Sequence, residues 1–150
     1  MLKIVMGYPE QDEERLLAAR TLTREAPEIL LDLGIVRPLL TEERLLQLRE
    51  ALNDITVPQP VLRYIVELVR VTRTHTSVKV GAGPRATQAL VLASRVHAAL
   101  NRRTETMVED VRAMAPPCLE HRLILKPDFV EKGLSCAETV KHILTSVPAP

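Results

Sequence analysis

Small side chains recur at helical spacing between Pro84 and about Leu100, and this stripe constrains the fold more than any other pattern in the chain. Alanines on one face of a helix let a neighbouring backbone approach closely. The 150 residues include no tryptophan, two tyrosines and one phenylalanine, so leucine, valine and alanine must build the core. We therefore predict an all-α fold, a small bundle of closely packed helices. The stripe consists of Ala86, Ala89, Leu90, Ala93, Val96 and Leu100.

Other segments also show helical periodicity or helix-end signals. Thr41 is a good N-cap, the pair Thr106 and Glu109 matches a capping box, and Ser135 precedes the last helix. Pro116 and Pro117 are expected to stop the helix that Thr106 starts. The expected helices are Glu10–Thr21, one from Thr41 with Leu45, Leu48, Leu52 and Ile55 on its face, Pro60–His75, Thr106–Met114 and Ala137–Ser146, with a loop at Ala26–Pro38.

The N-terminal segment Leu2–Met6 has the composition of a short strand, which Gly7, Tyr8 and Pro9 end. It has no neighbouring strand in the sequence with which to pair. A lone strand is not stable. We therefore expect this segment to be poorly ordered or to pair with another copy of the chain.

The loop before the alanine-rich helix is Gly81-Ala82-Gly83-Pro84-Arg85. Glycines permit unusual backbone conformations, and proline is pre-set for the first helical position, so the helix start is fixed in space. Arg85 then falls in the first turn, where the helix dipole opposes a cation by about 0.3–1 kcal/mol. Its guanidinium can bind two oxygens of one phosphate, so a nearby anion would offset this cost.

Two segments in this order resemble the C-terminal lid of MoxR-type AAA+ ATPases. They are GAGPRATQAL, Gly81–Leu90, and VEDVRAMAPPCLEHRLIL, Val108–Leu125. The opening LKIVMGYPE with Glu13, Glu14 and Arg15 is similar to the last core strand of that family and its link to the lid. The resemblance implies that residues 1–9 are strand and linker of an AAA+ core, and that residues 10–150 form the helical lid.

The resemblance also implies a role for the start of the alanine-rich helix. Arg85 falls on the sensor-2 arginine, which reaches the terminal phosphates of ATP, and Gly83 and Pro84 share this nucleotide-binding site. The lid would move relative to the core as ATP binds and is cleaved. Whether Arg85 serves the nucleotide of its own subunit or of a neighbour stays open.

The family further implies partners and cofactors for the intact protein. ATP and Mg²⁺ would be held mainly by the N-terminal AAA+ core, and the isolated chain would hold neither. The intact protein would form a homo-oligomeric ring, a hexamer, with a chaperone-like role toward clients that include von Willebrand A domain proteins.

Motifs for catalysis and metal binding are missing from this sequence. There is no G-x-x-x-x-G-K-[ST] and no acidic pair after an apolar strand, so we expect no catalytic residue here and no ATP hydrolysis by the chain alone. Cys118 and His121 lack a second ligand pair, which favours a buried thiol over a zinc site. The remaining histidines, His75, His97 and His142, are interpreted as separate surface or boundary residues.

Charge and composition exclude other classes. A net charge of +1 argues against nucleic acid as a partner. Interspersed acidic residues favour a solvated face over a basic patch for Arg70, Arg73, His75, Arg95, Arg102 and Arg103. No apolar run approaches membrane-spanning length. With no signal peptide and no CxxC pattern, Cys118 and Cys136 are expected to be reduced thiols of a cytoplasmic protein.

Two alternatives remain open at this point. In the first, the helix after Gly83 is a recognition helix of a nucleic-acid-binding module, although Ala86, Ala89 and Ala93 look like buried positions. In the second, the chain is a helical protein-interaction domain, and Arg85 pairs with one of its own carboxylates.

Overall fold

The computed structural model describes residues 2–22, 31, 33–34 and 37–150. The chain divides into two compact units, one of Val5–Leu48 and one of Met1–Ile4 with Arg49–Pro150. The loop predicted at Ala26–Pro38 lies largely outside the described residues. Within them, no helix is both long and apolar enough to span a bilayer.

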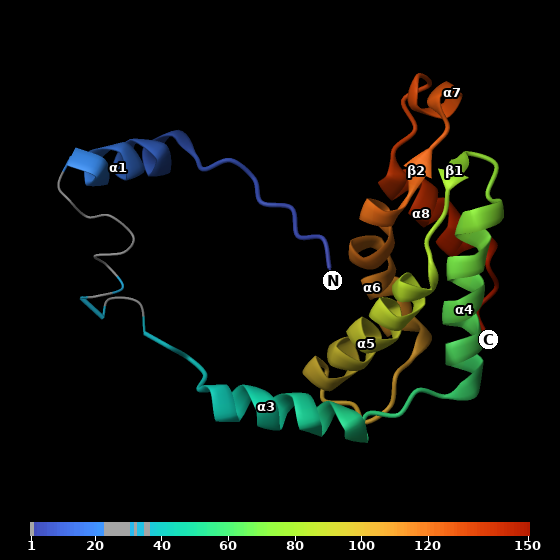
Figure 1. Cartoon of the computed structure of the whole chain (residues 1–150), viewed down its shortest axis with the longest axis horizontal. Coiled ribbons are helices and arrows are strands. Elements are labelled where there is room, and N and C mark those ends of the chain that lie inside the picture. Colours follow the sequence, from blue (N-terminus) through green and yellow to red (C-terminus); the bar gives the residue numbers. More distant parts are fainter. Residues whose placement is uncertain (1, 23–30, 32, 35–36) are drawn as a thin grey trace. The chain divides into compact units, whose positions relative to one another are not determined.

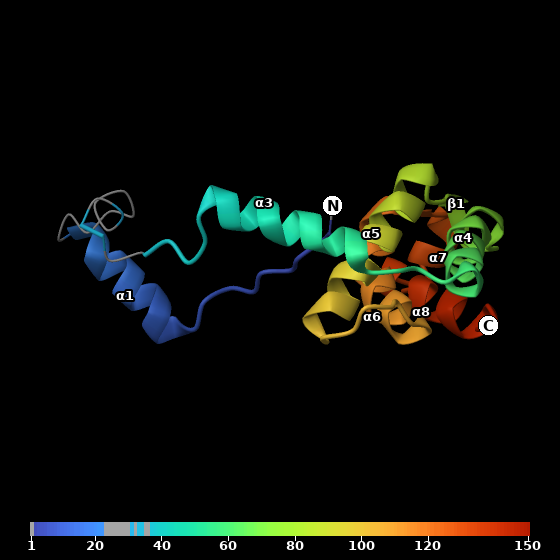
Figure 2. The same cartoon turned by 90° about the horizontal axis from the view of Figure 1, so that it is seen from below.

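The unit Val5–Leu48 contains helix α1, Gln11–Leu22, and most of helix α3, Glu42–Ala51 (Figure 2). Acidic residues occupy the first turn of each helix, where the dipole favours them. The hydroxyl of Thr41 accepts the Arg44 N–H at 3.2 Å, which confirms the predicted N-cap. Neither helix has a buried residue, and the predicted apolar positions Leu45 and Leu48 are 50% and 43% exposed.

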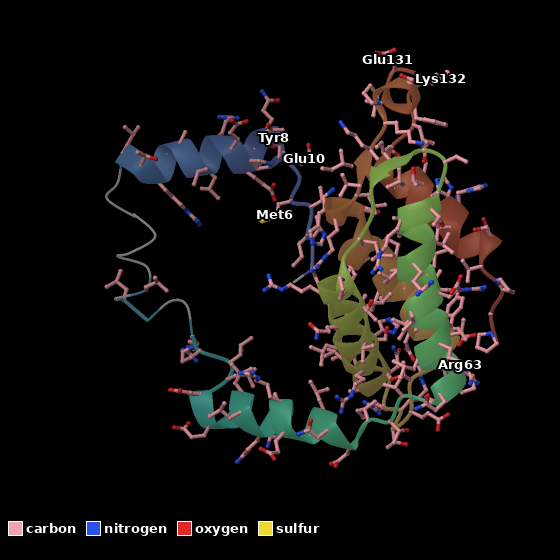
Figure 3. All side chains as sticks on the ribbon, turned by 45° about the vertical axis from the view of Figure 1, so that its right-hand side comes forward. Met6, Tyr8, Glu10, Arg63, Glu131 and Lys132 are labelled. Atoms are coloured by element: carbon pink, nitrogen blue, oxygen red, sulfur yellow. The ribbon has the colours of Figure 1, made fainter. Side chains whose placement is uncertain are left out.

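The N-terminal segment forms no strand within the described residues 2–10, as expected for a segment without a neighbouring strand, and its pairing with another copy of the chain stays a prediction. The Lys3 N–H instead donates to the Pro117 carbonyl at 2.8 Å, and Met6 and Tyr8 are exposed (Figure 3). A strand needs a neighbour that offers a row of backbone groups. None of the described segments offers one here. The division into residues 1–9 and 10–150 stays a prediction.

The larger unit is a helical bundle with a small two-stranded sheet at one end (Figure 1). The predicted all-α fold is confirmed. Its elements are η1 Leu52–Asp54, α4 Gln59–Thr74, β1 Val78–Val80, α5 Pro84–Leu100, α6 Val108–Leu119, η2 Glu120–Arg122, β2 Ile124–Leu125, α7 Pro127–Val130 and α8 Cys136–Ser146. Strands β1 and β2 are antiparallel, with Val78 opposite Leu125 and Val80 opposite Ile124.

Helices α4, α5, α6 and α8 meet in one apolar core, and α5 packs most extensively against α6. The alanine stripe of α5 is part of it: Ala86 and Leu90 are fully buried and Ala93 nearly so. Val96 and Leu100, which the stripe also included, are exposed, whereas Ser94 and Ala98 are buried. The largest fully buried side chains are Ile65, Leu68, Leu90, Leu119 and Ile143.

Helix α6 continues through both of its prolines, contrary to the prediction that they end it near Met114. Each proline removes one backbone hydrogen bond and disfavours the helix interior. The last turn is held by burial instead, because Ala115, Cys118 and Leu119 lie in the core. The Glu120 N–H closes the helix end by donating to the Pro116 carbonyl. Tertiary packing therefore outweighs the local preference at this position.

The start of α6 is set by Asp110, one residue later than the predicted pair of Thr106 and Glu109. Asp110 is fully buried, and its Oδ2 accepts the Met107 N–H at 2.8 Å. The same carboxylate accepts hydrogen bonds from His97 Nδ1 at 2.7 Å and from both terminal nitrogens of Arg103. Burial raises the pKa of this carboxyl, but the bonds from Arg103, His97 and Met107 outweigh burial, so the pKa lies below its ordinary value.

Substituting Asp110→Asn should destabilise the chain by about 3 kcal/mol, because the Arg103 guanidinium would lose its buried counter-charge. The lowered pKa also gives a pH dependence. The carboxylate stabilises the fold at pH values above its unfolded pKa of about 3.9, and this stabilisation is lost as the pH falls through the folded pKa. Urea unfolding between pH 3 and pH 7 measures both effects. Glu109→Gln, at the neighbouring exposed carboxylate, is the matched control and should change the stability little. A loss of stability as large as that of Asp110→Asn would show that Glu109 caps the helix, as the sequence predicts.

Candidate functional site

Helix α5 begins at the predicted residue. Gly83 is its N-cap, with φ −83° and ψ 177°, and Pro84 occupies the first helical position. The Gly83 carbonyl accepts the Ala86 N–H at 2.9 Å. No acidic side chain lies in the first turn, so the positive end of the helix dipole is not compensated by its own helix.

The loop ahead of α5 is held against the C-terminal end of α4 through Ala82. The Ala82 N–H donates to Thr72 Oγ1 at 2.9 Å, and the Ala82 carbonyl accepts from Arg73 Nε at 2.8 Å. Thr72 is fully buried, and its hydroxyl donates in turn to the Val69 carbonyl at 2.6 Å. The N–H and the carbonyl of Ala82, which is also buried, are therefore both bound by side chains of α4. This fixes where α5 starts.

The two glycines of the loop have different roles from those predicted. Neither has a positive φ. A Cβ on Gly81 would lie 2.6 Å from Arg73 Cα and 2.7 Å from the Thr72 carbonyl oxygen, so glycine is required there for close approach to the α4 backbone. A Cβ on Gly83 would meet nothing within 4 Å. The space around the Gly83 cap is therefore open.

Arg85 is exposed in the first turn of α5, directly after this fixed loop. Among the described residues, none offers its guanidinium a hydrogen bond or an ion pair. The alternative in which Arg85 pairs with a carboxylate of its own chain thus finds no partner in the part of the chain that the structure covers. Its planar donors remain available to an external anion.

Several arginines interpreted as a solvated face instead have structural partners, so that interpretation is wrong for them. Arg95 donates to the carbonyls of Leu52 and Ile55, which ties α5 to the segment before α4. Arg73 donates to the Ala82 carbonyl in the loop before α5, and Arg103 donates to the Asp110 carboxylate. Ala86 and Ala93 are buried in the core, so this face of α5 is not available to a nucleic acid.

Two of the histidines interpreted as separate meet in the structure. His75 Nε2 lies 3.1 Å from His142 Nδ1, between the end of α4 and α8. His97 belongs to the Asp110 cluster. Cys118 is fully buried, and burial raises the pKa of its thiol, as the prediction of a buried thiol requires. His121 is exposed.

Sequence reasoning missed Thr72 and Arg73, the residues that position the site. From the sequence, Thr72 is placed only within the predicted helix Pro60–His75, and Arg73 is interpreted only as a surface charge. A threonine on the buried face of a helix is a signal of a hydroxyl that needs a polar partner. The sequence does not identify that partner, because Ala82 lies ten residues away across a loop.

Comparison with known protein families assigns the helical bundle to a family. Residues 70–144 match the model of the AAA lid domain, which covers α5, α6 and nearly all of α8 as well as the end of α4. The matched range includes the whole loop from Gly81 to Arg85.

Curated relatives match over the whole chain. An uncharacterized protein of Bacillus subtilis, YeaC, is 30% identical over 150 residues, which is 45% of its own length. The chaperone MoxR1 of Mycobacterium tuberculosis is 28% identical over 163 aligned residues, 40% of its length. The chain thus spans less than half of the length of these relatives.

A solved structure shares the fold. It is the crystal structure of a protein from Cytophaga hutchinsonii that is provisionally named an ATPase, with a TM-score of 0.78 and 23% identity. The match covers all of this chain and 46% of that protein.

The two loop glycines provide a matched test of the site's geometry. Gly81→Ala should destabilise the chain by about 1–3 kcal/mol, because the added methyl group overpacks against backbone that cannot move aside. Gly83→Ala should stay within about 0.5 kcal/mol, because its φ suits any residue and the space is open. Thermal melting of both variants checks this. Equal losses for the two would show that the loop does not approach α4 as described.

Proposed function

This chain belongs to the AAA lid domain family and is a MoxR-type lid segment, and we propose that Arg85 is its contact with the terminal phosphate of ATP. The observation that carries the proposal is an exposed first-turn arginine without a partner among the described residues, held on a loop that Thr72 and Arg73 fix. Gly83 and Pro84 complete the site by leaving the approach to it open and setting the helix start.

The geometry supports binding of an anion. The uncompensated N-terminal end of α5 carries positive potential, and Arg85 adds a full charge beside it. A phosphate oxygen that approaches the Gly83 cap would meet no Cβ. A guanidinium can then take two oxygens of one phosphate in a single plane.

The γ-phosphate distinguishes ATP from ADP, so a contact with that group makes the lid sensitive to hydrolysis. Because the Thr72 and Arg73 side chains of α4 hold the Ala82 backbone, displacement of Arg85 would move α4 and the rest of the bundle with it. In this proposal the lid couples ATP hydrolysis to a domain movement.

The intact protein, in this proposal, joins the lid to an AAA+ core that holds ATP and Mg²⁺. The core assembles into a homo-oligomeric ring, a hexamer, with Arg85 acting on the nucleotide of its own or of a neighbouring subunit. The work of the ring is chaperone-like, with von Willebrand A domain proteins among its clients, and it takes place in the cytoplasm. One relative bears the name chaperone, which supports this class of activity.

Replacing Arg85 in a protein that joins this chain to its nucleotide-binding core tests the proposal. Arg85→Ala removes a charge-assisted contact worth about 1.5–3 kcal/mol, so ATP hydrolysis should fall roughly ten- to a hundredfold. ADP affinity should change much less. Arg85→Lys should restore only part of the activity, because an ammonium is a point charge that cannot grip two oxygens in one plane. Turnover and nucleotide affinity are measured beside thermal melting.

Arg63 is the matched control, because it is an exposed arginine nearer the other end of α4 (Figure 3). Thr72 lies nine positions further along the helix, about 14 Å along the axis. Arg63→Ala should leave turnover unchanged. Unchanged turnover in Arg85→Ala with a large loss of melting temperature would make Arg85 a structural residue and refute the proposal.

A further inference from the structure

Two imidazoles from distant parts of the chain face each other beside α7. His75 is the C-cap of α4, and His142 lies 67 residues later on α8. His75 Nε2 and His142 Nδ1 are 3.1 Å apart, and the ring planes are nearly perpendicular at 75°. His142 is exposed and His75 half-buried, so solvent and small ions reach the pair.

The separation of the two nitrogens suits a shared metal ion. Imidazole binds zinc with Zn–N distances of about 2.0–2.1 Å, so two such ligands on a tetrahedral ion lie about 3.3–3.4 Å apart. The observed 3.1 Å therefore requires an opening of only a few tenths of an ångström. His142 is exposed on α8 and His75 is the half-buried C-cap of α4, so rotation of the side chains can supply a movement of this size.

A buried hydroxyl provides the outer partner that metal-binding histidines usually have. Ser77 Oγ lies 2.9 Å from His75 Nδ1, and Ser77 is 1% exposed. The Ser77 N–H also lies 3.4 Å from Nδ1 and can donate to it when Nδ1 carries no hydrogen. In the other tautomer, which metal binding selects, Nδ1 donates to Ser77 Oγ and the Nε2 lone pair is directed toward His142. When His142 carries its hydrogen on Nε2, both facing nitrogens present lone pairs, and an ion can bind without release of a proton.

The surroundings leave room for water to complete the coordination. A hollow of about 560 Å³ adjoins the pair and is also lined by Glu138 and Lys132. Glu138 precedes His142 by one helical turn, but its Oε2 accepts from the Ser135 N–H at 2.8 Å and caps α8. Lys132 lies at the tip beyond α7 (Figure 3), with Nζ 5.9 Å from the Phe129 ring centre. Among the described residues no third histidine, cysteine or carboxylate completes a metal group.

We propose that His75 and His142 form a two-imidazole site for a divalent transition metal ion, Zn²⁺ or Ni²⁺, whose other ligands are water. Imidazole nitrogens suit these ions, and open positions filled by water make the site exchangeable. The ion would bridge the C-terminal end of α4 to α8. Because it binds the folded chain and not the separated histidines, it would stabilise the bundle in proportion to its concentration.

Acid should weaken this site, because protonation of either imidazole removes a ligand. Metal binding should therefore be weaker at pH 5 than at pH 7.5.

Calorimetric titration and thermal melting with ZnCl₂ and NiCl₂ test the proposal on the 150-residue chain at pH 7.5. A Cys136→Ser background removes the half-buried thiol as a competing ligand. We expect one ion per chain and a rise in melting temperature with metal concentration. His142→Ala, at an exposed position, should weaken binding at least tenfold and abolish the rise, and His75→Ala should do the same.

His121→Ala is the control, because His121 is exposed and lies outside this pair. It should keep the affinity, the stoichiometry and the rise in melting temperature. Equal binding by His142→Ala and the parent chain would place the ion elsewhere and overturn the proposal, as would the absence of any binding at millimolar metal. The outcome is independent of the role of Arg85, since no nucleotide is present.

Discussion

The two hydrogen bonds that attach the buried residue Ala82 to the end of α4 determine where α5 starts, and with it the candidate site at Arg85. Thr72 Oγ1 and Arg73 Nε satisfy its N–H and its carbonyl, and Gly81 brings the chain close enough for both bonds to form. An unpaired buried peptide group costs about 1–3 kcal/mol, so neither bond can be lost cheaply. The start of α5 follows directly, because Gly83 and Pro84 come next in the chain.

The helices could largely be predicted because their signals are local. The range of α5 matches the prediction from its apolar period and its proline, and α8 begins within one residue of the expected position. Ser135 caps α8 through a reciprocal pair with Glu138, which is readable from the sequence. In each case the residues that decide the structure lie in the helix itself or directly before it.

The errors arose where distant residues decide the outcome. Helix α6 passes through its prolines because Cys118 and Leu119 are buried against other helices, and no local rule predicts that burial. Asp110 caps α6 because His97 and Arg103 neutralise it in the core. In the sequence, a cap formed by Thr106 and Glu109, one residue earlier, fits the capping pattern equally well. Only the fold distinguishes the two.

The candidate site shows the same limit. The loop sequence drew attention to Arg85, Gly83 and Pro84 as candidate site residues. The resemblance to MoxR-type lids supplied their role in nucleotide binding, which the proposed function adopts. The sequence could not show that glycine is sterically required at position 81, or that Gly83 faces open space. Nor could spacing place His75 against His142, since their approach depends on how α8 packs on α4.

In the part of the chain that the structure describes, Arg85 lacks the structural partners that three other arginines of the larger unit have. Arg73, Arg95 and Arg103 each donate to a carbonyl or a carboxylate within the bundle. These partners account for their positions without any ligand. Arg85 has no such partner among the described residues and lies where the α5 dipole opposes it by about 0.3–1 kcal/mol. The fold gains nothing visible from a cation at this point. A bound anion would reverse the sign of that electrostatic cost, and this is the physical reason to assign Arg85 to a ligand and not to the fold.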